Sequence, residues 1–288
     1  MKVRKAVIVA AGLGTRMLPA SKVIPKEILP VVDRPAIQVV VEEAVASGIE
    51  EVVIVVAPGR TLVLDHFEPA VELERHLEER GKYDLLAMVR ATNPAVRITP
   101  ATQERPLGLG HAVLQARAAV GDEPFAVILP DDIFDADPPC LRQLIAVAEE
   151  RDAPVVALMR VAHADISKYG IVEATTAGER LYRLHGMVEK PEPAKAPSNF
   201  AIMGRYVLTP EVFELLAAGK PGAGGELQLT DALRALSQRR AMYGYEVIGT
   251  RYDLGDRFGF LAAQVGFGLK RPEVADRLRA YLRSVVST

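Results

Sequence analysis

Two glycines and an arginine near the start of the chain have the types and the spacing of a phosphate-binding loop. They lie in Ala10-Ala11-Gly12-Leu13-Gly14-Thr15-Arg16-Met17, directly after an apolar run. A glycine has no Cβ atom to keep a phosphate away from backbone N–H groups, and an arginine can bind phosphate through two parallel hydrogen bonds. The segment therefore predicts a loop for the phosphates of a nucleotide, with a ligand-free tight turn as the alternative.

The same segment departs from two common nucleotide-binding motifs. A dinucleotide-binding loop would have a third glycine at the position of Met17 and an acidic residue after the second strand. The second apolar run, 52–56, is followed by Ala57-Pro58-Gly59 instead, and no Lys-Ser or Lys-Thr pair follows the glycines as it would in a P-loop. A nicotinamide-dependent dehydrogenase is therefore a weak alternative.

Carboxylates and ammonium groups elsewhere could complete a site for phosphates. Lys26 is close enough along the chain to reach the same anion as the glycine loop. Asp131 directly follows an apolar run, and Asp253 stands between an expected strand and an expected helix, so both could hold Mg²⁺ together with phosphate oxygens. Glu189 could bind sugar hydroxyls, and Lys190 could neutralise a second phosphate. Turns, helix caps and exposed ion pairs use the same residue types, so each assignment has a purely structural alternative.

The composition indicates a globular protein without a basic surface. The 288 residues are 49% hydrophobic, enough for the core of one large α/β domain or of two small ones. A formal net charge of −2 gives nucleic acid no electrostatic attraction. No run approaches the roughly 20 apolar residues of a membrane span. The single cysteine, Cys140, excludes an internal disulfide and is typical of a reducing compartment. We therefore expect a cytoplasmic protein with no nucleic-acid or membrane partner, in which Cys140 is a small buried residue.

Apolar runs alternate with amphipathic segments in the first half of the chain. We expect strands at 6–10, 52–56, 96–101 and 125–129 and helices near 35–47, 69–80 and 110–119. Apolar strands separated by helices indicate a largely parallel sheet that is covered on both faces. Ligands bind beyond the carboxyl ends of such strands, which is where the glycine loop, 103–110 and 130–132 lie.

The second half of the chain is less regular. We expect strands at 154–161, 171–174, 180–189, 200–208 and 242–248, with a turn at Thr176-Ala177-Gly178. Helices are expected at 210–218, 257–269 and 272–286. The glycine-rich segment 219–225 predicts a mobile loop near the site.

A series of short motifs runs in order nearly from end to end of the sequence. They are Gly12-x-Gly14-Thr15-Arg16-Met17-Leu18-Pro19, Pro25-Lys26-Glu27-x-Leu29-Pro30, Gln103 with Gly108-x-Gly110-His111-Ala112, Leu129-Pro130-Asp131, Tyr169-Gly170, Glu189-Lys190-Pro191, Asn199, Gly204-Arg205-Tyr206, Gln228-Leu229-Thr230-Asp231 and Asp253-x-Gly255. Together they resemble the bacterial UTP–glucose-1-phosphate uridylyltransferases, a branch of the sugar-nucleotide pyrophosphorylases. The first two motifs are specific to this branch.

The resemblance implies a Rossmann-like three-layer α/β/α sandwich with a mostly parallel mixed central sheet. It implies one nucleotidyltransferase domain over 1–288, with a nucleotide-binding half (about 1–135), a sugar-phosphate-binding half (about 136–255) and C-terminal helices (about 256–288). The implied reaction is Mg²⁺-assisted transfer of the uridylyl group of UTP to glucose 1-phosphate, which gives UDP-glucose and pyrophosphate. A homodimer or homotetramer is implied as well.

The resemblance also assigns roles to individual residues. Those that would hold the nucleotide are Ala11, Gly12, Gly14, Thr15, Arg16 and Lys26, with Gln103 and Gly108 at the uracil base. Those that would hold the sugar phosphate are Gly170, Glu189, Lys190, Asn199 and Glu226. Asp131 and Asp253 would bind Mg²⁺. The catalytic set would be Arg16, Lys26, Asp131 and Lys190, with Arg16 chiefly on the departing pyrophosphate.

The sequence departs from the family pattern at two positions, and related activities stay open. Arg257 stands where the family usually has lysine, and Asp132 follows Asp131 where an apolar residue is common and could perturb the metal site. A thymidylyltransferase that uses dTTP, or an enzyme for another hexose 1-phosphate, would have a similar loop. A non-catalytic nucleotide sensor would be expected to lack Arg16, Lys190 or a metal-binding carboxylate, and all of these are present.

Overall fold

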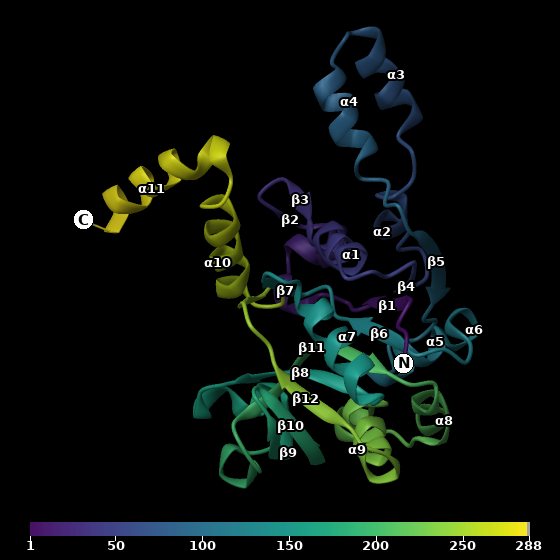
Figure 1. The fold of residues 1–288 in the computed structure, drawn as a ribbon. Helices are drawn as coiled ribbons and strands as arrows, with labels where there is room; N and C mark the ends of the chain where they lie inside the picture. The colour runs from purple at the N-terminus through teal and green to yellow at the C-terminus, as the bar shows by residue number, and fades with distance from the viewer. Residues whose placement is uncertain (287–288) are drawn as a thin grey trace.

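A mixed β-sheet runs through the centre of the protein (Figure 1). The computed structural model describes residues 1–286. Within them, nine strands form the sheet in the order β5-β4-β1-β6-β11-β8-β12-β10-β9. These strands are β1 (Lys5–Ala10), β4 (Glu51–Val56), β5 (Arg97–Thr102), β6 (Phe125–Ile128), β8 (Val155–Arg160), β9 (Gly170–Gly178), β10 (Leu181–Glu189), β11 (Phe200–Leu208) and β12 (Tyr243–Glu246). Two small sheets lie outside it: β2 (Pro30–Val31) with β3 (Arg34–Pro35), and β7 (Asp132–Asp135) with β13 (Thr250–Asp253).

The first half of the chain forms the parallel part of the sheet. β1 pairs in parallel with β4 and with β6, and β5 continues the sheet in parallel from β4. The carboxyl ends of these four strands therefore lie along one edge. β11 joins the two halves, because it is antiparallel to both β6 and β8, and β12 adds one more parallel pair with β8. The expected mixed sheet is confirmed, with its parallel pairs concentrated in the first half.

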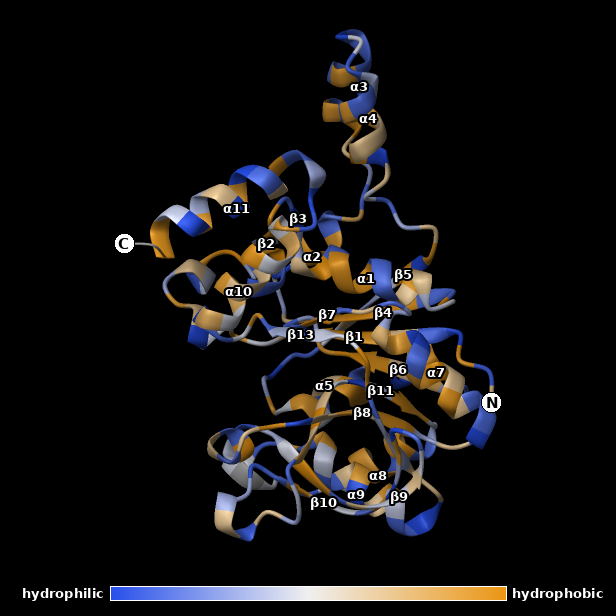
Figure 2. Cartoon of the chain, turned by 60° about the vertical axis from the view of Figure 1, so that its left-hand side comes forward, coloured by the Kyte–Doolittle hydropathy of each residue, from blue (hydrophilic) through white to orange (hydrophobic). Residues whose placement is uncertain are grey.

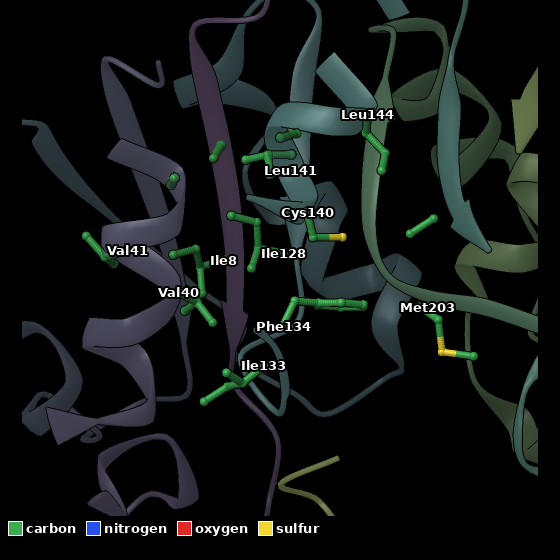
Figure 3. Packing of buried hydrophobic residues seen from close by; sticks show 14 of the residues in the cluster. Ile8, Val40, Val41, Ile128, Ile133, Phe134, Cys140, Leu141, Leu144 and Met203 are labelled. Atoms are coloured by element: carbon green, nitrogen blue, oxygen red, sulfur yellow. The ribbon is translucent and has the colours of Figure 1, made fainter. Parts of the chain in front are cut away.

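Helices cover both faces of the sheet, which confirms the three-layer sandwich. Alternate residues of a strand point to opposite faces, and the two faces build two separate cores. α1 (Ala36–Ala46) and α7 (Cys140–Arg151) pack on the face that includes Ile8. α5 (Leu109–Gln115), α8 (Glu211–Ala218) and α9 (Leu229–Arg239) pack on the face that includes Val7. Figure 3 shows the first core, with Val40 of α1, Ile8 of β1 and Leu141 of α7 close together.

The remaining helices lie outside these layers or extend them. They are α2 (Leu62–Asp65), α3 (Val71–Glu79), α4 (Tyr83–Arg90), α6 (Arg117–Val120), α10 (Arg257–Gly268) and α11 (Pro272–Val286). α3 and α4 form a hairpin that projects from the body, and α10 and α11 project in another direction (Figures 1 and 2). None of the helices within residues 1–286 combines the length and the apolar character needed to cross a membrane.

The structure differs from the expected elements at a few places. Segment 110–119 forms two helices, α5 and α6, instead of one. β9 extends to Gly178, so the turn that follows lies at Glu179-Arg180 and not at 176–178, with Arg180 at a φ of 55°. Helix α4 and the pair β7–β13 are additional. Cys140 is buried in the first turn of α7, as expected.

Candidate active site

A cavity of about 600 Å³ lies where β6, β9, β10, β11 and the start of α9 meet. Its wall contains six of the residues predicted from the sequence: Arg16, Asp131, Gly170, Glu189, Lys190 and Asp253. A smaller cavity of about 200 Å³ adjoins the glycine loop and is lined by Gly14, Thr15, Arg16, Met17, Lys26 and Gly255. Arg16 lines both cavities, so we take the two together as the candidate site.

The conformation of the glycine loop is fixed by a left-handed glycine and by a side-chain hydrogen bond. Gly14 has a φ of 68°, a left-handed conformation that favours glycine. Its carbonyl accepts a hydrogen bond from the Ser21 hydroxyl at 2.7 Å. A Cβ atom at Gly12 would lie 3.9 Å from Cε of Lys26, so the loop passes directly along the lysine side chain.

Asp131 is held by two of the predicted cations. Lys26 Nζ lies 2.7 Å from Asp131 Oδ2, and Arg16 Nη2 lies 3.7 Å from the same oxygen. Burial raises the pKa of Asp131, but Lys26 and Arg16 outweigh it and hold the pKa below its usual range. Burial likewise lowers the pKa of Lys26, and Asp131 with Glu27 brings it above its ordinary value. Asp131 is therefore an ionised carboxylate at neutral pH.

Asp132 and Asp253 both accept hydrogen bonds from Arg251, a residue to which the sequence analysis gave no role. Arg251 donates to Asp132 Oδ1 through Nε at 2.8 Å and through Nη2, and Nη2 also lies 3.3 Å from Asp253 Oδ2. Gly204 N–H donates to Asp132 Oδ2 at 2.9 Å, so both oxygens of Asp132 have partners. Arg251 and Asp253 stand two positions apart on β13, and this period-two spacing on a strand was the signal that could have linked them.

Asp131 and Asp253 have the donor chemistry of a magnesium site. Both are carboxylates in the wall of the larger cavity. No group of three or more histidine, cysteine, aspartate or glutamate side chains in residues 1–286 has a metal-binding arrangement. A hard cation held by one or two carboxylates takes its other oxygen ligands from water and substrate phosphates, so this donor set fits.

The carboxyl end of β10 carries the predicted sugar-phosphate residues. Glu189 pairs with Gly170 across β10 and β9, and its Oε2 accepts a hydrogen bond from Thr230 Oγ1 at 2.6 Å. A Cβ atom at Gly170 would lie 3.2 Å from both of these oxygens, so a side chain there would crowd them. Lys190 Nζ lies 3.5 Å from Glu189 Oε1, and the lysine side chain, which lines the cavity, is 55% exposed.

Several predicted residues lie outside the walls of these two cavities, within the part of the chain that the structure describes: Ala11, Gly12, Gln103, Gly108, Asn199 and Glu226. Gln103 is buried, and its amide nitrogen donates to the Gly108 carbonyl at 3.1 Å. A Cβ atom at Gly108 would lie 2.7 Å from Cβ of Glu226, so Glu226 lies beside the predicted base-binding loop. Asn199 is exposed, and its carbonyl accepts the Val161 N–H.

Glu27 is a buried carboxylate for which the sequence analysis gave no role. It is 2% exposed, and neither carboxylate oxygen has a hydrogen-bond partner among the described residues. Lys26 Nζ lies 3.9 Å from Oε1. Burial raises the pKa of Glu27 to about 7, although Lys26 opposes the shift.

Tyr169 and Thr230 also line the larger cavity. The sequence analysis placed both in motifs but gave them no role.

Comparison with known proteins identifies the family. The model of the nucleotidyl transferase family matches residues 5–266. The chain belongs to this family. It is 49% identical over 286 residues to UTP–glucose-1-phosphate uridylyltransferase 2 of Streptococcus pyogenes, across 98% of this chain and 95% of the relative.

Two solved structures are close in fold over nearly the whole chain. A UDP-glucose pyrophosphorylase complexed with UDP-glucose has a TM-score of 0.85 and 39% identity, and the match covers 94% of this chain and 100% of that one. A UTP-bound enzyme of the same kind from Acinetobacter baumannii has a TM-score of 0.90 and 37% identity, over 98% of this chain and 99% of that one. The family resemblance and the fold expected from the motifs are confirmed.

Proposed function

We propose that this nucleotidyltransferase transfers the uridylyl group of UTP to glucose 1-phosphate and releases UDP-glucose and pyrophosphate. The observation that carries the proposal is a single cavity wall that brings together Arg16, Asp131, Glu189, Lys190 and Asp253. These are the residue types that a nucleotide triphosphate, a metal and a sugar phosphate require. The names of the S. pyogenes relative and of the two solved structures support the choice of UTP and glucose.

The reaction needs charge neutralisation more than it needs proton transfer. A phosphate oxygen of glucose 1-phosphate attacks the α-phosphorus of UTP in line, a new P–O bond forms, and the bond to the departing pyrophosphate breaks. The attacking oxygen is already anionic, so no general base is required. The main barrier is the approach of two polyanions, which positioned cations and backbone N–H groups lower. Lys190 would hold the sugar phosphate, Arg16 the departing pyrophosphate, and Lys26 would assist Arg16.

The remaining predicted contacts are those that the family resemblance implies. The backbone at Ala11, Gly12, Gly14 and Thr15 would line the triphosphate, and Gln103 with Gly108 would meet the uracil base. Gly170 and Glu189 would bind the glucose hydroxyls, with Asn199 beside the sugar. Glu226, which lies beside Gly108, would also line the sugar-phosphate side of the pocket.

We propose that Asp131 and Asp253 hold Mg²⁺ when the nucleotide binds. The ion would supply positive charge to the phosphate oxygens. The chain's own part is to keep Asp131 ionised, and Lys26 at 2.7 Å does this directly. Arg251 contributes by fixing the orientation of Asp253.

We further propose one domain whose halves, about 1–135 and 136–255, supply the nucleotide and sugar-phosphate sides, and which forms a homodimer or homotetramer. Large apolar side chains are exposed on the two projecting parts, including Tyr83 and Met88 on α4, and Phe258 and Leu261 on α10. Such exposure favours association with another chain. Sedimentation of the purified protein tests the assembly. The substrates are metabolites of the cytoplasm, where we expect the reaction to occur.

Pyrophosphate release tests the proposed reaction. Purified protein is supplied with Mg²⁺, glucose 1-phosphate and one of UTP, dTTP, ATP, GTP or CTP. We expect rapid release with UTP and slower release with dTTP, because a pocket rejects one methyl group by only about 1–3 kcal/mol. Dominant release with dTTP would assign the protein to the thymidylyltransferases. Absence of release with every nucleotide and with other hexose 1-phosphates would refute a catalytic role.

A further inference from the structure

Arg205 is a fully buried cation directly behind the wall of the larger cavity. It lies on β11, where Met203 and Val207 on the same side of the strand belong to the core beneath α1 and α7. The side chain is 0% exposed. A buried guanidinium costs free energy unless its donors are satisfied, so its partners indicate what it does.

Glu43 of α1 fixes one side of the guanidinium. Arg205 Nε lies 3.1 Å from Glu43 Oε1, and Nη2 lies 2.6 Å from Oε2, a bidentate pair. Glu43 Oε1 also accepts the backbone N–H of Leu141 at 2.9 Å, in the first turn of α7, where N–H groups lack an acceptor within the helix. Cζ of Arg205 lies 5.2 Å from the ring centre of Phe134, which Figure 3 shows in this core beside Cys140. The orientation of Arg205 is therefore set by α1 and the core.

The other side of the guanidinium binds the turn that carries Asp131. Arg205 Nη1 donates to the carbonyls of Leu129 at 3.1 Å and of Gly204 at 3.2 Å. The Leu129 carbonyl also accepts the N–H of Asp132 at 3.2 Å, which closes the turn 129–132. The Gly204 carbonyl accepts the N–H of Leu129 at 2.8 Å. A single nitrogen of Arg205 thus binds the carbonyl that closes this turn and the carbonyl that joins the turn to β11.

The pairing of β11 is irregular on one side only, because Arg205 pairs in register with Ile128 of β6, next to the turn. The register between β11 and β8 shifts between Ile202 and Tyr206, the segment that contains Gly204 and Arg205. Gly204 also approaches Asp132 so closely that a Cβ atom would lie 2.8 Å from Asp132 Oδ2. The arginine therefore adds side-chain hydrogen bonds to the turn 129–132 at the point where the pairing of β11 with β6 ends.

We propose that Arg205, oriented by Glu43, is a positioning residue that sets the turn 129–132 and through it the carboxylates of Asp131 and Asp132. It touches no substrate in this arrangement. The proposal rests on the function proposed above, in which Asp131 meets the metal and the nucleotide. Without the guanidinium the carbonyls of Leu129 and Gly204 would each lose a hydrogen bond, and Asp131 would no longer be held in place against Lys26 and Arg16.

Two variants separate positioning from folding. Arg205→Met alone would leave the Glu43 carboxylate buried without a counter-charge, so we combine it with Glu43→Gln. The pair is then neutral, and the amide oxygen of the introduced glutamine still accepts the Leu141 N–H. Replacing a buried ion pair by neutral side chains often preserves stability. Arg205→Lys is the second variant, because it keeps the charge near Glu43 but lacks the planar fork that also reaches the turn.

Val207→Ala is the matched control. Val207 lies on the same face of β11, is 0% exposed, and belongs to the same core, but makes no bond to the turn. Its truncation lowers Tm by leaving a cavity. For every variant we measure Tm, kcat and KM well below Tm, and UTP binding by calorimetry with and without Mg²⁺.

We expect kcat of both Arg205 variants to fall by about 10- to 100-fold, because a displacement near 1 Å can cost that much. The strengthening of UTP binding by Mg²⁺ should be lost as well, whereas Val207→Ala should retain both properties despite its lower Tm. Normal kcat and Mg²⁺-dependent UTP binding in the folded Arg205 variants would overturn the proposal, as would the same losses in Val207→Ala. If the natural protein released no pyrophosphate, the proposed function would fail, while the calorimetric comparison would still decide the role of Arg205.

Discussion

Replacing Gly255 by alanine tests whether Arg16 works from the position that the structure gives it. An added Cβ atom would lie 2.5 Å from Arg16 Nη2, 2.9 Å from Arg16 Cζ and 3.0 Å from Asp253 Oδ1. The nearest contact is too short to persist, and the group that must move is the end of an exposed side chain. The φ of Gly255 lies outside the left-handed range, so alanine adds no backbone strain. We therefore expect a displaced Arg16 in an otherwise intact fold.

The size of the effect follows from the bond that Arg16 would lose. A hydrogen bond to a charged group contributes about 1.5–3 kcal/mol. Loss of one such contact to the departing pyrophosphate lowers kcat/KM by about 10- to 100-fold. Because the contact strengthens as pyrophosphate leaves, the loss should fall mainly on kcat. Tm should change little.

Pyrophosphate release with UTP and glucose 1-phosphate measures this loss. The control is a double-mutant cycle with Arg16→Met. If the alanine acts by moving Arg16, the double variant should be no slower than Arg16→Met alone. Natural kcat/KM in Gly255→Ala, or losses that simply multiply in the double variant, would refute the placement of Arg16.

Three other substitutions test separate parts of the site. Lys190→Met removes the cation proposed for the sugar phosphate, and kcat should fall by about 100-fold or more in the same assay, with circular dichroism as the control for folding. Gly170→Ala crowds Glu189 Oε2 and Thr230 Oγ1 at 3.2 Å and should raise KM for glucose 1-phosphate but not for UTP; equal increases would contradict the assignment. Burial raises the pKa of Glu27 from 4.5 to about 7, so the folded protein binds more protons than the unfolded chain in this window, and the free energy of unfolding falls as pH rises through it. Glu27→Gln should remove that fall, and an unchanged pH dependence in urea unfolding would count against it.

The sequence predicts best those elements whose signal is local. β1, β4 and β6 are buried on both faces, so each is a continuous apolar run, and their bounds agree with the expected ones to within one residue. β7 and β13 have no such run. They pair only with each other, with Asp132 opposite Asp253, and the pairing joins segments more than a hundred residues apart along the chain. Their stability comes from that partner, which no window of sequence contains.

The same limit applies to the site. Asp131 could be predicted, because a carboxylate directly after a parallel strand lies at the ligand-binding edge. The sequence does not reveal that Lys26 would bind Asp131, since 105 positions separate them. The family resemblance assigns Glu226 to the sugar side. The Leu227 N–H donates to the Leu107 carbonyl and brings Glu226 beside the predicted base-binding loop, a contact between two distant segments of the chain.

Lys190 shows most directly where local preference and structure disagree. The residue before a proline favours extended backbone, and a lysine rarely takes a positive φ. Lys190 precedes Pro191, yet its φ is 45°. Its N–H donates to the Tyr169 carbonyl at 3.0 Å, which holds the strained turn at the end of β10. Such strain costs about 1–3 kcal/mol and persists where the surrounding structure imposes it, most often at functional sites. The strained backbone at Lys190 is therefore evidence, independent of the motif, that the position of its side chain matters for the reaction.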